Sequence, residues 1–183
     1  RSRIPDRRCR ARLRAWSLTT LATVALLSTL IHRQTLAALA ATVTSALGLS
    51  DVQYGWLSTG MAAAFLLGSL PAARFAQRIG PQVALTLTVA ATSLVIGLHA
   101  LVQGFWFLLI LRIGMGMANS SAMPAATQTI HRVLPFKDRA RGIALLYLGS
   151  SLGSAVCAPL AVALESYVGW RWTFFAVAVL GLV

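Results

Sequence analysis

Two arginines of this sequence stand inside long apolar stretches, where a charge is costly unless it has a function or a partner. Arg33 follows His32, and Arg112 precedes Asn119 by two helical turns. A charged side chain at mid-bilayer costs at least about 2.5–3.5 kcal/mol on insertion scales. A guanidinium offers planar, bidentate hydrogen bonds to a carboxylate or a phosphate. We therefore predict that these four residues line a water-filled path and bind an anion.

Each of the four residues also has a structural interpretation. Arg33 is alternatively a residue that snorkels to the membrane surface or pairs with another helix. Arg112, Gly116 and Asn119 recur at i, i+4 and i+7 on one helix face. That face equally predicts a network of hydrogen bonds between helices. His32 either titrates near neutral pH or serves as a neutral hydrogen-bonding group.

The sequence lacks the patterns that are typical of catalysis or cofactor binding. It contains no Walker loop, metal-ligand cluster or nucleophile–base arrangement, and residues 114–116 (GMG) do not follow a strand as a dinucleotide fingerprint would. Cys9 lies in a basic segment and Cys157 in an apolar one, which gives neither a disulfide framework nor a metal spacing. We expect no enzyme activity, no cofactor and no metal ion.

The composition favours a membrane protein over a soluble one. Of the 183 residues, 57% are hydrophobic and 11% are charged, and the mean hydropathy is +0.75. A soluble domain carries about 25% charged residues. Because too few charges remain to coat a globule of this size, we expect lipid to surround the chain.

The net charge of +12 comes from cations that are clustered along the chain. They gather in an N-terminal arm and in alternate short connections between apolar stretches: Arg1, Arg3, Arg7, Arg8, Arg10, Arg12 and Arg14, then Arg74 and Arg78, then Arg132, Lys137, Arg139 and Arg141. This alternation is the positive-inside pattern of membrane proteins. It predicts a cytoplasmic N-terminus and argues against a nucleic-acid partner.

Apolar stretches predict an all-α bundle of six transmembrane helices. A bilayer core of about 30 Å needs roughly 20 apolar residues per helix. The expected helices cover residues 16–47, 54–76, 83–102, 105–130 and 142–164, and a sixth begins near residue 170. We divide the chain into a basic cytoplasmic arm (1–14) and a six-helix membrane half-domain (15–183). The last helix is too short to cross the core at 1.5 Å per residue, so we expect it to be truncated.

Small residues and prolines inside the expected helices predict how they pack and bend. Gly149 and Gly153 form a GxxxG spacing, which allows two helix backbones to approach closely. Pro71, Pro124 and Pro159 also fall within helices. Proline is tolerated in membrane helices and is typical of bends.

Several short motifs, taken in their order and spacing, resemble the major facilitator superfamily. The segment 73–81 (ARFAQRIGP) resembles that superfamily's signature G-x-L-A-D-R-x-G-R, with Arg78 and Gly80 matching. Within the superfamily, the chain resembles the anion:cation symporter family. That resemblance rests on residues 48–50 (GLS), 53–55 (QYG), 112–116 (RIGMG), Pro124, Pro135, 138–141 (DRAR) and 169–174 (GWRWTF).

This resemblance implies the N-terminal half of a twelve-helix secondary transporter. It implies substrate binding near the midplane between two six-helix halves, with the second half as partner and a small organic anion (a carboxylate or sugar acid) as substrate. It also implies gating by the loops that hold Gln77, Arg78 and Gly80 in one case and Asp138 and Arg139 in the other. The expected location is the bacterial cytoplasmic (inner) membrane.

Departures from the family pattern bear on the coupling ion, which we expect to be a proton or sodium. Many family members have Asp-Arg where this chain has His32-Arg33, and Glu where it has Asn119. The signature aspartate is Gln77, and the first glycine is Ala73. Because both membrane carboxylates are replaced, an alternative interpretation is a truncated, non-transporting remnant or an accessory membrane protein.

Overall fold

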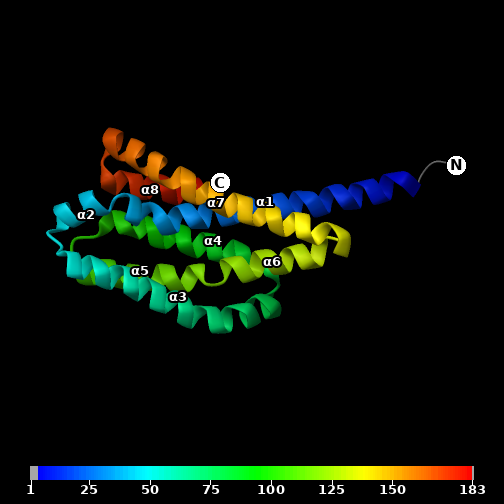
Figure 1. The fold of residues 1–183 in the computed structure, drawn as a ribbon, viewed down its shortest axis with the longest axis horizontal. Coiled ribbons are helices and arrows are strands. Elements are labelled where there is room, and N and C mark those ends of the chain that lie inside the picture. The colour runs from blue at the N-terminus through cyan, green and yellow to red at the C-terminus, as the bar shows by residue number, and fades with distance from the viewer. Residues whose placement is uncertain (1–3, 183) are drawn as a thin grey trace.

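The computed structural model describes residues 4–182, and these form an all-α bundle, as predicted. Its elements are α1 (Ile4–Ala38), α2 (Ala40–Leu47), α3 (Asp51–Ile79), α4 (Pro81–Leu98), the 3-10 turn η1 (His99–Leu101), α5 (Phe105–Asn119), α6 (Ala122–Val133), α7 (Phe136–Val168) and α8 (Trp170–Leu182). Arg1 and Arg3 of the predicted arm lie outside the described residues. Figure 1 shows the helices side by side along one axis.

The two ends of the bundle differ in charge. At the basic end, α1 begins, α3 passes into α4, and α6 passes into α7. At the opposite end, which we call the acidic end, α2 passes into α3, η1 leads to α5, and α7 passes into α8. Asp51 and Glu165 lie at this acidic end. The alternating directions of the helices therefore gather the cations of three separate sequence segments at one end.

The outer surface of the bundle is apolar, as the surface of a protein embedded in lipid must be. Leu66, Leu67 and Leu70 on α3 are each about two-thirds exposed or more. Five segments of the described chain are long and apolar enough to cross a membrane: Arg12–Ala38, Asp51–Ile79, Pro81–Leu101, Phe105–Val133 and Phe136–Val168. These spans coincide with the first five of the six predicted helices.

The predicted fourth helix is interrupted in the structure. α5 ends at Asn119 and α6 begins at Ala122, with Ser120 and Ser121 between them. Pro124 explains the break, because its ring lacks an N–H and clashes with the carbonyl four residues earlier, which is that of Ser120. The hydroxyl groups of Ser120 and Ser121 donate to the carbonyl oxygens of Met117 and Ala118 at 2.6 and 3.3 Å.

The predicted first helix is also divided, and it starts earlier than expected. α1 runs without interruption from Ile4, so the basic arm is a helical extension of the first membrane helix and projects beyond the bundle (Figure 1). Leu39 separates α1 from α2 with φ −101° and ψ 16°. No proline or glycine stands at this break, and we have no physical account of it.

Glycines bring pairs of helices into close contact, as the GxxxG spacing predicts. α1 packs along α7, α3 along α5, and α4 along α8. A Cβ atom at Gly153 would lie 2.7 Å from the carbonyl oxygen of Leu27 on α1. A Cβ atom at Gly116 would lie 3.0 Å from the backbone nitrogen of Phe65 on α3. Side chains at these positions would force the helices apart.

Candidate functional site

A layer of buried polar side chains separates two apolar cores. One core lies towards the acidic end and includes Leu36, Ile96 and Met115; the other lies towards the basic end and includes Leu26 and Leu85. Between them on α1, α4 and the interrupted fourth helix are Thr29, His32, Thr88, Thr92, Ser93, Asn119 and Ser120, all at most 4% exposed. We call these seven residues the polar layer. Two arginines, described below, adjoin it.

His32 turns into the bundle, away from the arginine that follows it in sequence. Its Nδ1 lies 3.2 Å from Oγ1 of Thr92 on α4, and its Nε2 lies 3.2 Å from the carbonyl oxygen of Val177 on α8. The side chain is 1% exposed, and Gly181 leaves the space that the ring occupies. Both ring nitrogens therefore have partners inside the bundle.

Arg112 is buried without a carboxylate. Its side chain on α5 is 5% exposed, yet no salt bridge reaches it within the described part of the chain. Nη1 lies 3.2 Å from Sδ of Met61 and 3.4 Å from the carbonyl oxygen of Arg33, to which it donates. Nε has no hydrogen-bond partner. One weak sulfur acceptor, one long contact to a carbonyl oxygen and one unpaired N–H leave much of this guanidinium's hydrogen-bonding capacity unused.

Arg33, on α1, lies near Arg112 of α5, but its side chain is exposed. Its guanidinium carbon lies 5.1 Å from the centre of the Phe65 ring on α3, a cation–π contact. Ala37, one turn further on, is exposed on the same side of α1. The structure thus places an exposed arginine of α1 next to a buried arginine of α5, whose guanidinium reaches the backbone carbonyl oxygen of Arg33.

Asn119 lies on the same buried face of the fourth helix as Arg112 and Gly116, as the i, i+4, i+7 spacing predicts. Its side chain is 3% exposed, and its Nδ2 has no hydrogen-bond partner. The residue stands directly before the break at Ser120. Asn119 is therefore a buried donor at the point where the fourth helix loses its regular hydrogen bonds.

Two residues that contact the arginines were missed by the sequence analysis. Met61 and Phe65 lie one turn apart on α3, and their neighbours on α1 and α5 are distant in sequence. The register between α3 and α5 decides this contact, and no spacing within one segment reports it. An aromatic residue and a methionine in an apolar helix are otherwise ordinary core residues.

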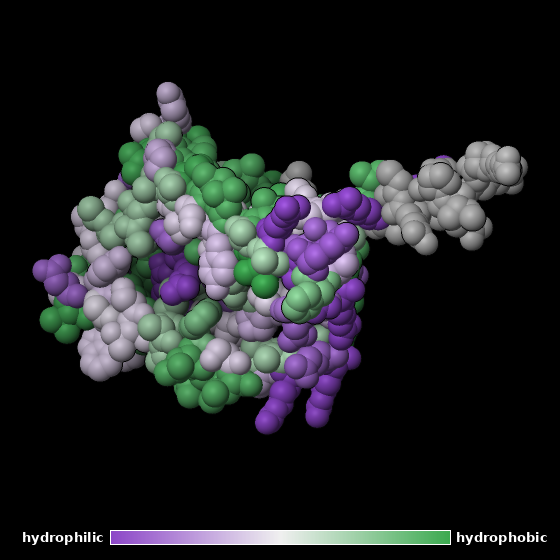
Figure 2. Space-filling view, turned by 45° about the vertical axis from the view of Figure 1, so that its right-hand side comes forward, coloured by the Kyte–Doolittle hydropathy of each residue, from purple (hydrophilic) through white to green (hydrophobic). Residues whose placement is uncertain are grey.

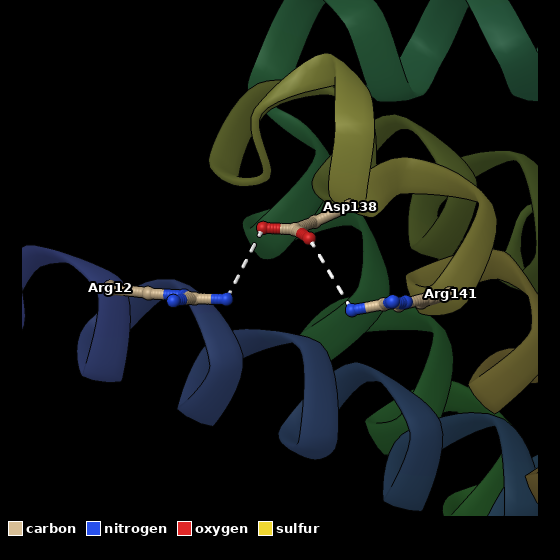
Figure 3. Close-up of polar contacts among 3 residues, drawn as sticks. All are labelled: Arg12, Asp138 and Arg141. Atoms are coloured by element: carbon tan, nitrogen blue, oxygen red, sulfur yellow. Dashed lines mark ion pairs between the residues drawn. The ribbon is translucent and has the colours of Figure 1, made fainter.

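Asp138 forms a second polar centre at the basic end. Its carboxylate lies between Arg12 of α1 and Arg141 of its own helix, with N···O distances of 3.9 and 4.0 Å (Figure 3). The Asp138 side chain is 6% exposed, whereas those of the arginines are 65% and 76% exposed. The contact ties the start of the first membrane helix to the start of α7.

The other predicted gating residues lie at the same end. Arg139 donates to the carbonyl oxygens of Leu134 and His131 at 3.3 and 3.1 Å and so fixes the connection between α6 and α7. Gln77 and Arg78 are exposed in the last turn of α3, and Gly80 follows with φ +93°, a backbone angle that favours glycine. No hydrogen bond or ion pair joins these three to Asp138 or Arg139 among the described residues.

A family model described as Major Facilitator Superfamily matches residues 20–183, which is nearly the whole chain. The chain belongs to the Major Facilitator Superfamily. It is therefore an integral membrane protein of a transporter superfamily, as the resemblance of its motifs predicted.

The relatives of this Major Facilitator chain agree with that assignment. It is 29% identical over 152 residues to a probable L-galactonate transporter of Escherichia coli K12, covering 83% of this chain and 34% of the relative. It is 32% identical over 143 residues to the probable chloroplastic anion transporter 4 of Oryza sativa subsp. japonica, covering 77% and 24%. The chain thus spans about a third of the length of these relatives or less.

A solved structure has the same fold. The crystal structure of a bacterial homologue of the human lysosomal transporter Spinster, in an inward-facing and occupied conformation, superposes with a TM-score of 0.84. It is 23% identical and covers 92% of this chain and 42% of that protein. The six-helix arrangement of this Major Facilitator chain, with α1–α2 and α5–α6 each counted as one interrupted helix, is therefore that of a solved transporter.

Proposed function

We propose that this chain is one six-helix half of a secondary transporter that moves a small organic anion, a carboxylate or sugar acid, by alternating access. The observation that carries this proposal is the buried guanidinium of Arg112, which has no carboxylate partner among the described residues and an unpaired Nε. A buried charge without a partner is expensive, so a ligand of opposite charge offsets that cost. The named functions of the relatives support an anion.

In this mechanism, Arg33 and Arg112 contact the anion directly. Arg33 is exposed and donates to the incoming carboxylate. Arg112 is buried behind it, with Nη1 3.4 Å from the backbone carbonyl oxygen of Arg33. Phe65 holds the Arg33 guanidinium through its ring. An anion that neutralises both charges stabilises a closed, dehydrated state, because a ligand shifts an equilibrium by its differential affinity for the two states.

His32 and Asn119 lie behind the arginines in the polar layer, and we assign them to positioning and coupling. His32 already has partners on α4 and α8, so an ion that coupled to it would have to break one of these contacts. Asn119 carries a free Nδ2 and replaces a residue that could hold a proton. The coupling ion, a proton or sodium, would then depend on groups supplied by the partner half.

The basic end faces the cytoplasm in this proposal, and the membrane is the bacterial inner membrane. The cations of the arm and of two connections gather at this end, in agreement with the positive-inside rule. The loops with Gln77, Arg78 and Gly80 and with Asp138 and Arg139 lie where a cytoplasmic gate would open. The contact between the arm and Asp138 would then join the arm to that gate.

Uptake of sugar acids and carboxylates into proteoliposomes that hold the complete gene product tests this function. We expect counterflow of at least one such anion in the unaltered protein and its loss in Arg33→Ala, with unchanged amounts of inserted protein. Arg33→Lys keeps the charge but loses the bidentate geometry and should retain a reduced rate. Arg14→Ala, which removes an exposed arginine of the arm, is the matched control and should transport normally.

Normal counterflow in Arg33→Ala would remove this residue from the substrate path. Absence of counterflow for every anion in a correctly folded, unaltered protein would favour a non-transporting membrane protein. Thermal unfolding with and without the anion then shows whether such a protein still binds the anion, since a bound anion raises Tm even where no transport occurs.

Asn119→Glu tests the coupling assignment. The substitution places a carboxylate that can carry a proton at the position of the free Asn119 donor, so uptake should depend more steeply on pH. Asn119→Gln keeps the amide and serves as control. An unchanged pH profile in Asn119→Glu would mean that this position is isolated from the path.

A further inference from the structure

The basic end carries far more positive charge than its carboxylates can balance. Among the side chains that the structure describes near the ends of α3, α6 and α7, five cations are exposed: Arg74, Arg78, Arg132, Lys137 and Arg141. Of these, Arg141 lies 4.0 Å from Asp138, and no ion pair of the other four is found among the described residues. The acid described here is Asp138, which is buried and already lies between two arginines. Figure 2 shows hydrophilic side chains gathered at this end of the bundle.

Some of these cations repel one another within their own helices. Arg74 and Arg78 are four residues apart on α3, and Lys137 and Arg141 are four residues apart on α7. Like charges at this spacing destabilise a helix by about 0.2–0.5 kcal/mol per pair. An anionic surface outside the protein would offset the repulsion within both pairs, which explains why they are tolerated.

Apolar side chains are interleaved with these cations. Phe136, the first residue of α7, is 86% exposed beside Lys137. Phe75 and Ile79 are 47% and 37% exposed and alternate with Arg74 and Arg78. A surface for nucleic acid or a soluble acidic protein has no need of exposed apolar side chains between its charges. The boundary between lipid headgroups and acyl chains accommodates both kinds of side chain.

The lengths of the helices put these residues at headgroup depth. α3 has 29 residues and α7 has 33, which at 1.5 Å per residue correspond to about 43 and 50 Å. The hydrocarbon core is about 30 Å thick, and the bilayer with its headgroups about 40–45 Å. The last turn of α3 and the first turns of α7 therefore extend into the layer where lipid phosphates lie.

We propose that the basic end of the bundle is a docking surface for anionic phospholipids, whose phosphates bind to Arg74, Arg78, Arg132 and Lys137 while Phe136 and Ile79 contact the acyl chains. This surface is separate from the arginines in the middle of the bundle. It holds the basic end at the membrane surface through lipid headgroups, in addition to the hydrophobic match of the helices.

Native mass spectrometry of the detergent-solubilised protein tests this surface by titration with phosphatidylglycerol and, separately, phosphatidylcholine. We expect tighter binding of phosphatidylglycerol, weakening as salt is raised. The fourfold variant Arg74→Gln, Arg78→Gln, Arg132→Gln, Lys137→Gln should lose at least about tenfold in affinity for phosphatidylglycerol, given the contribution of each basic residue near an anionic surface. The charge-keeping variant Arg74→Lys, Arg78→Lys, Arg132→Lys should bind like the unaltered protein.

The remaining arginines of the arm keep the topology of the fourfold variant, which cysteine labelling from either side of the membrane checks, and its Tm shows that it is folded. Equal affinity for the two lipids in the unaltered protein would overturn the proposal, as would unchanged affinity in the fourfold variant. Displacement of the lipid by millimolar inorganic phosphate at matched ionic strength would identify a site for free anions instead. Tighter binding of polyglutamate than of phosphatidylglycerol would identify a protein-docking surface, and either result overturns the lipid assignment.

Discussion

Pairs of arginines occur in two regions of this bundle, and the regions differ in whether a carboxylate stands between the pair. At the basic end, Asp138 lies between Arg12 and Arg141 at 3.9 and 4.0 Å. In the middle, Arg33 and Arg112 lie side by side, and no salt bridge to either occurs among the described residues. In the first region a carboxylate stands between the two arginines, whereas the described residues of the second region supply none.

The difference has an energetic meaning because the two regions have different surroundings. Arg12 and Arg141 are largely exposed, so water would solvate them without Asp138, and their ion pairs contribute little. Arg112 is 5% exposed, so a missing counter-charge is expensive there. Stability alone would favour a carboxylate beside the buried Arg112 more than one beside the exposed Arg12 and Arg141. Among the described residues, the carboxylate lies beside the exposed pair. This contrast supports an external anion at the middle of the bundle.

The largest expected effect comes from supplying the missing carboxylate. Met61→Glu places an acid beside Nη1 of Arg112, which lies 3.2 Å from the Met61 sulfur. A carboxylate within the protein competes with substrate at an effective concentration in the millimolar range or above, so uptake should fall by at least about tenfold. Met61→Gln introduces a side chain of the same shape as glutamate without its charge, so uptake should fall much less. Equal losses in the two variants, measured in proteoliposomes, would show that charge at this position is irrelevant.

The second prediction is a substitution that stabilises the protein, whereas most substitutions of buried residues destabilise it. Arg112→Met replaces a buried, unpaired charge by an apolar side chain of similar length. It should raise the stability of the substrate-free protein by about 1–3 kcal/mol while abolishing anion-dependent protection against unfolding. Tm in detergent, with and without the transported anion, measures both. A lower Tm without anion would indicate that Arg112 has a structural partner and would remove the basis of the comparison.

The membrane helices could be predicted well from the sequence because the bilayer imposes one simple requirement on their composition. Each spanning segment must be apolar over roughly 20 residues, and this length is visible in the chain. The ends were predicted less well: α7 begins at Phe136 rather than at residue 142, because lysine and arginine continue a helix readily although they end an apolar run. The interruption before Pro124 follows from proline chemistry, whereas the interruption at Leu39 has no counterpart in the sequence.

The site was predictable only in part. Neighbouring residues on an α-helix point about 100° apart, so His32 and Arg33 face different sides of their helix. The structure accordingly turns His32 towards Thr92 and leaves Arg33 exposed. Contacts between helices were out of reach, because the register of α3 against α5 brings Met61 to Arg112, and nothing within either segment records that register. The same holds for the contact between α1 and the start of α7, which are distant in the sequence.

The smallest effect is expected where the carboxylate is already present. Asp138→Asn removes the charge between Arg12 and Arg141, and it also removes the acid from the first turn of α7, where it favours the helix dipole. Because both arginines are more than half exposed, the loss should be only about 1 kcal/mol, seen as a modest fall in Tm. Asp138→Glu keeps the charge, so its Tm should lie between that of Asp138→Asn and that of the unaltered protein. The sign is what matters for the comparison: removing a charge lowers stability at the basic end and raises it at Arg112. If Asp138→Asn raised Tm as well, the carboxylate at the basic end would not be compensating its arginines, and its presence there could no longer be contrasted with its absence in the middle.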